Sequence, residues 1–536
     1  GVVRSAIERD EATEADVDAK VRRILELVER TRATDRATTE TALDGPPERA
    51  LVRRAAAEST VLMKNDGLLP LPQGMKIAVI GELADDTPHQ GGGSSQIPAH
   101  RVVSVLDGLV DALGNDAIVG FEPGVSIRRN PPVLDPDSIV GDGFVFEYFD
   151  NLDLSGEPVR VTASDRTFWP YFGTRDPWID FRGFSMRVTG RFRAMKSGTH
   201  RFGFGAIGRL RGMVDGSSIV DAWQGADQTH EWEASLSPGD EIEIVAEFST
   251  LDNEVLERTA VEDGDRWRYL AFTCVLPAPA PDLARAQVLA AEADAAVVVV
   301  GRTHEWEAEG WDRPDLRLPG GQDDLIEDVA RVQPNTIVVV TAGSPVEMPW
   351  LDEVAAVVHA WFPGQEAGHA IADVLTGSVD PGGRLPVVFP ATSGQHPGLL
   401  NFPGLGGEVR YGEGVLVGQR AYDRLGLEPL FPFGHGMSYT SFEVGDAEAR
   451  SDGGEGFVVA VPVRNVGDRP GTEVVQVYAL GLSGVPRRLV GYRKVRLGVG
   501  EATVVEVTVP SDLLRTWDSS RSECCLLYTS PSPRDL

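Results

Sequence analysis

The chain has 536 residues, enough for three or four domains of about 100 to 200 residues each. Hydrophobic residues make up 42% of it and charged residues 24%, a balance typical of folded globular proteins. The formal net charge of -31 repels nucleic acids and anionic lipids, so neither is predicted as a partner. Because no apolar run approaches the ~20 residues of a membrane-spanning helix, we predict a soluble protein that binds small neutral molecules.

The cysteines argue against a disulfide framework and against a structural zinc site. Cys274, Cys524 and Cys525 are the only ones, and they are not spaced like metal ligands. The letters that follow Cys525 resemble a translated sequencing-library adapter rather than a protein. We therefore predict that residues 519–536 are a tail of artefactual origin and leave them out of the fold assignment.

The first 32 residues contain a strong helix pattern. Thr13 and Asp16 have the spacing of an N-terminal capping pair, and apolar residues recur at helical spacing from Val17 to Val28. The predicted helix is amphipathic, so its apolar face needs a partner. Residues 33–48 are polar and rich in Thr, which predicts a linker.

An α/β pattern begins after this linker and is interrupted once. Its strands are fully apolar, which predicts a parallel sheet covered by helices on both faces. We assign residues 49–140 and 277–405 to one α/β sandwich domain. The helix-like runs are 51–63, 283–293 and 322–332, and the strand-like runs are 76–80, 295–301, 336–340 and 354–361.

Two further segments alternate apolar and polar residues with the period of a β-strand. In residues 141–276, for example, Ile242 and Ile244 alternate with Glu241 and Glu243. Since α/β strands lie on both sides, this segment is predicted to be a β-sandwich inserted into a loop of the α/β domain. After a linker at 406–440, residues 441–518 predict a second, truncated antiparallel sandwich.

Four motifs then resemble one family. Residues 61–71 (VLMKNDGLLPL), 342–350 (AGSPVEMPW), 361–366 (WFPGQE) and 431–439 (FPFGHGMSY), in this order, are similar to family 3 glycoside hydrolases of the β-glucosidase kind. The resemblance implies an α/β sandwich domain with an inserted β-sandwich of the protective-antigen type. A fibronectin type III-like domain is expected to follow.

The resemblance also implies that part of the enzyme lies outside this sequence. The helix within residues 1–32 resembles the last helix of the family's (β/α)8 barrel, and the family carries its nucleophilic Asp in that barrel, upstream of Gly1. We therefore expect a retaining exo-hydrolase that removes terminal non-reducing β-glucosyl residues, with the nucleophile absent from this chain. The expected partner is a small β-glycoside and no cofactor is expected, while a homo-oligomer is left open.

Retaining glycosidases need a second carboxyl group as general acid and base, about 5 to 5.5 Å from the nucleophile. Glu305, Glu307 and Glu309 crowd the loop after the strand that ends at Gly301, and loops at the carboxyl ends of parallel strands are where ligands bind. Crowding and nearby tryptophans predict a raised pKa for at least one of the three. The residues alone do not rank them. The resemblance implies Glu309, which precedes Gly310, as the acid/base, with Glu307 as the alternative.

Other residues near this loop are candidates for binding the substrate. They are Trp306, Ser94 and Ser95, the two serines lying in the glycine-rich run of residues 91–95. This run lacks the spacing of a phosphate-binding loop. His304 is the only imidazole in the glutamate loop, so no metal site is predicted.

Two alternatives stay open. The runner-up to a β-glucosidase is a β-xylosidase, or a glycosidase of glycosylated natural products, in the same family. A non-catalytic carbohydrate-binding or scaffold protein also fits, because two β-sandwiches are expected and the nucleophile is not.

Overall fold

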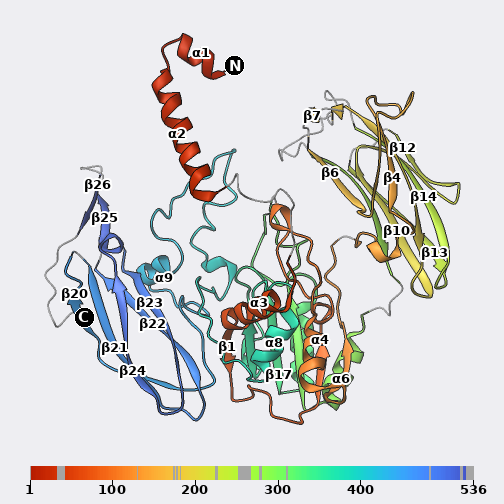
Figure 1. Ribbon diagram of the computed structural model, residues 1–536. Coiled ribbons are helices and arrows are strands. Elements are labelled where there is room, and N and C mark those ends of the chain that lie inside the picture. Colours follow the sequence, from red (N-terminus) through yellow and green to blue (C-terminus); the bar gives the residue numbers. More distant parts are fainter. Residues whose placement is uncertain are drawn as a thin grey trace. The chain divides into compact units, whose positions relative to one another are not determined.

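The computed structural model describes residues 2–32, 43–129, 131–172, 175–176, 179–180, 183–223, 227–250, 267–276, 281–309, 312–454, 456–481, 485–518 and 523–526. The chain divides into two compact units, Gly1–Arg54 and Ala55–Leu536. Both units are drawn in Figure 1.

The first unit is helical. Helix α1 spans Val2–Glu8 and helix α2 spans Glu14–Thr31. The predicted capping pair is confirmed, because the Thr13 side chain accepts from the Asp16 amide while the Asp16 carboxylate accepts from the Thr13 amide. The predicted apolar face is exposed: Ile24 and Leu25 have relative accessibilities of 60% and 61%. Residues 33–42 of the predicted linker lie outside the described residues.

Helix α3, Pro46–Ser59, is shorter than predicted. The predicted helix-like run extended to Met63, but strand β1, Val61–Asn65, begins two residues after Ser59. The β-branched Thr60 and Val61 favour an extended backbone, and β1 pairs antiparallel with strand β18, Ala356–His359. Tertiary pairing therefore overrides the helical pattern in the last part of this run.

The α/β sheet has six strands in the order β1-β18-β17-β16-β2-β3. All of its pairings except β1–β18 are parallel. The predicted parallel sheet is thus confirmed, with one antiparallel edge strand. Its other strands are β2 (Ile77–Ile80), β3 (Ile118–Glu122), β16 (Ala295–Gly301) and β17 (Thr336–Thr341).

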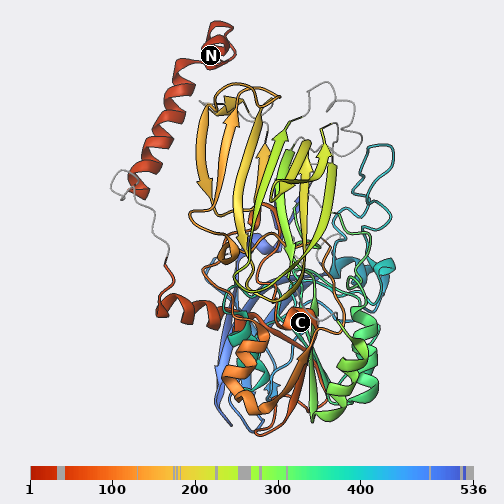
Figure 2. The same cartoon turned by 90° about the vertical axis from the view of Figure 1, so that its right-hand side faces the viewer.

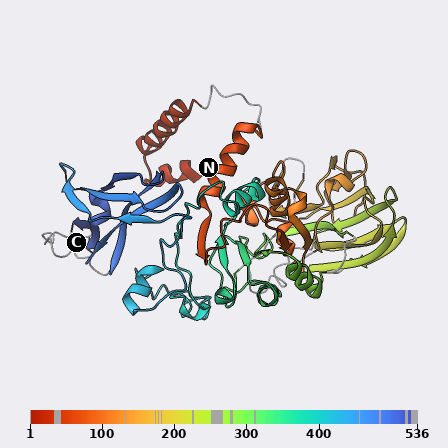
Figure 3. The same cartoon turned by 90° about the horizontal axis from the view of Figure 1, so that it is seen from below.

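Helices cover both faces of this sheet, as Figures 2 and 3 show. On one face, helices α3, α4 (Val105–Leu113) and α8 (Ala367–Leu375) contribute to a core that includes Val79, Val297 and Val339. On the other, α6 (Leu283–Glu292) and α7 (Gln322–Val332) pack with Ile80, Val298 and Val338. The strands are buried along their length because each face has its own core.

The strand order reverses between β2 and β16. From β2 the chain first adds β3 on one side, and after a long excursion it adds β16, β17 and β18 on the other. In open α/β sheets, ligands bind in the crevice at such a reversal, beyond the carboxyl ends of the strands. The loops that follow Ile80 and Gly301 are therefore the expected place for a site.

In its described residues, the excursion between β3 and α6 consists of β-strands and loops with one short 3-10 turn, Pro136–Ser138. It forms a four-stranded sheet, β13-β10-β15-β6, and a six-stranded sheet, β12-β11-β14-β9-β4-β5, which share one core that includes Phe146, Phe204 and Phe248. Trp169 belongs to this core and contacts Phe146. The strands are β4 (Phe144–Phe149), β5 (Arg160–Ser164), β6 (Phe168–Phe172), β7 (Arg175–Asp176), β8 (Ile179–Asp180), β9 (Ser185–Arg193), β10 (Gly198–Ile207), β11 (Arg209–Val214), β12 (Ser217–Ala222), β13 (Asp227–Leu236), β14 (Glu241–Ser249) and β15 (Trp267–Val275).

The C-terminal part is a smaller antiparallel sandwich, reached after helix α9, Gln419–Leu425. Strands β19 (Phe442–Val444), β20 (Glu448–Ser451), β21 (Phe457–Asn465) and β24 (Ala502–Val509) form one sheet, and β22 (Gly471–Leu480) and β23 (Arg487–Leu497) form another. Both contribute to one core. A hairpin of β25 (Arg515–Asp518) and β26 (Glu523–Leu526) follows, and the rest of the predicted tail lies outside the described residues. Within the described ranges, none of the helices is both long and apolar enough to cross a lipid bilayer.

His359 makes the sheet sensitive to acid. It is fully buried at the end of β18 against Trp361 and Phe389, and among the described residues neither ring nitrogen has a hydrogen-bond partner. Burial, and secondarily the Arg302 charge, lower the pKa of His359 from 6.5 to about 3. The unfolded chain therefore binds a proton below pH 6.5 that the folded chain does not, and stability is lost as the pH falls through this window.

We predict that His359→Phe removes the part of the acid sensitivity that comes from protonation of His359. Hydrogen exchange between pH 4 and 6.5 measures the free energy of opening of β18. In the wild type this free energy should fall with decreasing pH by up to about 1.4 kcal/mol per pH unit more than in His359→Phe. His100→Gln, which changes an exposed histidine, is the control and should keep the slope. An unchanged slope in His359→Phe would show that this ring is not the proton acceptor.

Candidate active site

Two glycines allow the chain to leave the sheet at its carboxyl edge. Gly81 follows β2 with φ +104°, and Gly301 ends β16 with φ +154°. A Cβ atom at Gly81 would lie 2.1 Å from the Val299 oxygen, and one at Gly301 would lie 1.9 Å from the Thr341 oxygen. Neither position admits a side chain. Glycine at each allows the backbone to turn away from the sheet while it stays close to the neighbouring strand.

The loop after β16 is bound to the glycine-rich loop after β2. The Gly92 amide donates to the Glu307 carbonyl at 2.9 Å, and Gly92 forms a parallel bridge with Ala308. A Cβ atom at Gly92 would lie 2.4 Å from the His304 oxygen, and one at Gly93 would lie 2.6 Å from the Glu309 Cβ. The glycine run therefore serves close backbone approach between the two loops.

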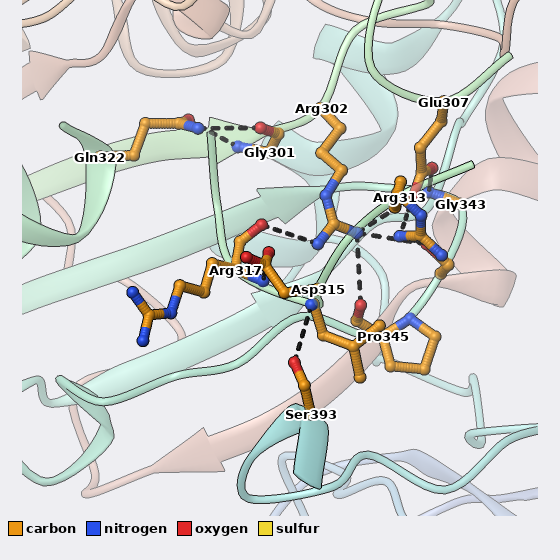
Figure 4. A network of polar contacts seen from close by, with 12 residues as sticks. Gly301, Arg302, Glu307, Arg313, Asp315, Arg317, Gln322, Gly343, Pro345 and Ser393 are labelled. Carbon is orange, nitrogen blue, oxygen red and sulfur yellow. Dashed lines mark hydrogen bonds and ion pairs between the residues drawn. The ribbon is translucent and has the colours of Figure 1, made fainter. Parts of the chain in front are cut away.

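Glu307 lies inside a cluster of fixed donors (Figure 4). Its Oε1 accepts from Arg302 at 3.0 Å and from Arg313 at 2.9 Å, and also from the Ser344 hydroxyl. Its Oε2 accepts from the Gly343 amide at 2.6 Å. The Glu307 side chain is only 11% exposed. Both oxygens are thus held by the protein.

Arg302 is the most buried member of this cluster, with 2% of its side chain exposed. Besides Glu307, its guanidinium donates to the Arg317 carbonyl at 2.8 Å and to the Pro345 carbonyl at 3.3 Å. Burial, followed by the Arg313 charge, lowers the pKa of Arg302, and Glu307 opposes this shift. The cluster therefore joins the loop after β16 to the loop after β17.

Glu309 has a different environment, on the solvent side of the same loop. Its carboxylate accepts from the Ser94 amide at 3.1 Å and from the Ser94 hydroxyl, and its side chain is exposed. The Ser94 hydroxyl, and next the Ser94 amide, lower the pKa of Glu309. The expectation that crowding raises a carboxyl pKa is therefore wrong for Glu309, because donors rather than other carboxylates surround it.

The remaining candidates are brought near the loop but make internal contacts. The Trp306 indole donates to the Ile127 carbonyl at 2.8 Å, and the Arg129 guanidinium lies 5.5 Å from the ring centre. The Ser95 hydroxyl donates to the Gly92 carbonyl at 3.0 Å. Of the two candidate serines, Ser94 contacts the glutamate loop with its side chain and Ser95 stabilises the glycine turn.

Sequence reasoning missed Arg302, Arg313, Gly343 and Ser344 as members of this site. One signal was present: Gly343 and Ser344 belong to a motif that follows an apolar strand, as the glutamate loop does. The carboxyl ends of adjacent parallel strands meet at one edge, so contact between the two loops follows from topology. The burial of Arg302 had no comparable signal.

The chain belongs to glycoside hydrolase family 3. Residues 60–439 match the family described as "Glycosyl hydrolase family 3 C-terminal domain", and residues 473–526 match the "Fibronectin type III-like domain". The first match includes both halves of the α/β sheet and the four motifs. The second confirms the expected C-terminal domain.

Relatives extend beyond this chain. A Rhizobium radiobacter β-glucosidase is 37% identical over 527 residues, covering 95% of this chain and 64% of the relative. The crystal structure of a Kluyveromyces marxianus β-glucosidase in complex with glucose has 29% identity and a TM-score of 0.82, covering 98% of this chain and 65% of that one. A Streptomyces venezuelae β-glucosidase structure with D-glucose has 29% identity and a TM-score of 0.67, covering 98% of this chain and 63% of that one. The chain thus spans about two thirds of their length.

The Ser94 contact gives a testable pKa. We predict that Ser94→Ala raises the pKa of Glu309, because the larger of the two causes that lower it is removed. Titration of the carboxyl carbon by NMR in this chain measures the change. Ser95→Ala is the matched control, since its hydroxyl donates within the glycine turn. An equal effect of both substitutions would mean that loop distortion, not hydrogen bonding, sets the pKa.

Proposed function

We propose that this chain is part of a retaining, exo-acting glycoside hydrolase that removes terminal non-reducing β-glucosyl residues. The observation that carries the proposal is the position of Glu309: it lies on the solvent side of a loop at the strand-order reversal, beside the glycine-rich loop. The β-glucosidase names of the relatives and the glucose bound in two similar structures support the sugar assignment.

Glu309 is proposed as the acid/base. In the first step it protonates the departing glycosidic oxygen while a nucleophilic Asp attacks the anomeric carbon. In the second step it takes a proton from the water that releases the sugar. The Asp belongs to the third of the relatives' length that this chain does not match, so this chain alone should be inactive. No cofactor takes part in this chemistry.

Glu309 fits the acid/base role better than Glu307, because its carboxylate is exposed and, within the described part of the chain, has fewer hydrogen-bond donors around it. Glu307 is shielded, and both of its oxygens accept from arginines and from the Gly343 and Ser344 groups. Glu309 is exposed, and its contacts come from Ser94 alone among the hydrogen bonds of the described residues. We infer that the leaving-group oxygen displaces the Ser94 hydroxyl on binding. This exchange frees the carboxyl from a donor that lowers its pKa.

The remaining roles follow from this placement. Ser94 and Ser95 are proposed to hydrogen-bond sugar hydroxyls, and Trp306 to form part of the site wall. We propose that the insert, residues 141–276, is a β-sandwich of the protective-antigen type within an α/β domain of residues 49–140 and 277–405. Residues 1–32 are proposed to complete a barrel domain, and residues 441–518 form the last domain.

The acid role predicts a dependence on the leaving group. In an enzyme that joins this chain to the segment it lacks, Glu309→Gln should lower kcat/KM for an alkyl β-glucoside by about 10²- to 10⁴-fold. A dinitrophenyl β-glucoside, whose leaving group needs no proton, should lose far less at the glycosylation step.

Glu305→Gln is the matched control, because it changes a carboxylate of the same loop that accepts from the Arg129 amide at 3.1 Å. It should show no leaving-group dependence. Equal losses on both substrates in Glu309→Gln would remove Glu309 from the acid role. Binding of glucosides without turnover by the complete wild type would favour the carbohydrate-binding alternative.

A further inference from the structure

We infer that Glu307 is a positioning residue: clamped by Arg302 and Arg313, its carboxylate fixes the loop after β16 against the loop after β17 and thereby places Glu309. This role rests on the proposed function of Glu309. The three side chains of Arg302, Glu307 and Arg313 are called the clamp below.

Both oxygens of the Glu307 carboxylate are engaged by the protein. Within the described chain, the Glu307 carboxylate accepts from two guanidinium groups, one hydroxyl and one amide. Oε1 accepts three of these contacts and Oε2 accepts the fourth. Only 11% of the side chain is exposed, which leaves little room for a substrate or a water molecule to reach it. The contacts therefore favour a structural role for this carboxylate.

Arg302 and Arg313 anchor the Glu307 carboxylate. Arg302 directly follows β16, and its guanidinium contacts two loops. It reaches the Glu307 carboxylate and the Arg317 carbonyl in the loop after β16, and the Pro345 carbonyl in the loop after β17. Arg313 repeats the contact to Glu307 and also donates to the Ser344 hydroxyl at 2.6 Å. Charge-assisted bonds of this kind are stronger and more directional than neutral ones. Asp315 contributes a further negative charge near Arg302.

Backbone contacts couple the position of Glu307 to that of Glu309, which is two residues further along the chain. The Glu307 carbonyl accepts from the Gly92 amide, and Ala308 bridges to Gly92. A Cβ atom at Gly93 would lie 2.9 Å from the Glu309 nitrogen, so that backbone is packed closely. The side chain of Glu307 holds one side of the loop and its backbone holds the other. If the side chain is released, Glu309 is held only by the contacts of its loop with the glycine-rich loop.

Hydrogen exchange on this chain tests the clamp without any catalysis. In Glu307→Gln, the amides of residues 303–309 and 342–344 should exchange at least about tenfold faster, because local opening no longer breaks charged contacts. The amides of the buried strands β16 and β17 should be unchanged. Ser344→Ala removes one donor and should give a smaller increase, which covers the case that Glu307→Gln does not fold.

Glu309→Gln is the matched control for this measurement. It neutralises a glutamate two residues away whose carboxylate accepts from Ser94 and not from the clamp. It should leave exchange at residues 342–344 unchanged. Unaltered exchange in both Glu307→Gln and Ser344→Ala, or an equal increase in Glu309→Gln, would overturn the clamp.

Kinetics of the completed enzyme separate positioning from proton donation. Glu307→Gln should lower kcat more for alkyl than for dinitrophenyl β-glucosides, because a misplaced acid matters most where the leaving group needs a proton. It should keep the basic limb of the pH profile, which belongs to Glu309, and Glu307→Asp should recover part of the loss. Loss of the basic limb in Glu307→Gln, with the limb kept in Glu309→Gln, would make Glu307 the acid and overturn the inference. An inactive wild type would overturn the proposed function, while the exchange data still decide whether the clamp exists.

Discussion

The positive charge of Arg302 at the end of a fully buried strand is the constraint on which the site depends. Only 2% of its side chain is exposed, so water cannot compensate the charge. Removing the partner of a buried ion pair typically costs about 3 to 5 kcal/mol, because the remaining charge stays buried. The loop after β16 must therefore return Glu307 to Arg302. Glu309, two residues later, then lies on the solvent side.

The sheet places this ion pair, and with it the glutamate loop, at the edge where ligands bind in open α/β sheets. Since the strand order reverses between β2 and β16, the loops that follow these two strands lie at this edge. The same two loops meet through Gly92 and Glu307. Glycines at positions 81, 92, 93 and 301 serve this convergence, because a Cβ atom at each would clash. The inserted segment leaves the sheet after β3, so it does not interrupt the parallel order of the strands.

The sequence predicted the parts of this architecture that depend on local pattern. The fully apolar strand at 295–301 and the helix at 322–332 lie at the predicted residues, because burial on both faces leaves a continuous apolar run. The capping pair at Thr13 was predictable for the same local reason. By contrast, Val61–Met63 form a strand rather than a helix, because their partner β18 lies almost 300 residues away in the chain. The Arg302–Glu307 pair and the donation of Ser94 to Glu309 are likewise products of folding. These contacts give Glu307 and Glu309 different environments, and the sequence of the loop that they share does not reveal that difference.

The spacing of two carboxyl groups tests the account most directly. In a crystal structure of the complete enzyme, with this chain joined to the segment that its relatives carry, the Glu309 carboxyl should lie about 5 to 5.5 Å from the nucleophilic Asp, across the sugar site. Glu307 should remain paired with Arg302 and directed away from the sugar. A structure with Glu307 facing the nucleophile at that spacing, and Glu309 turned away from the sugar, would contradict the account.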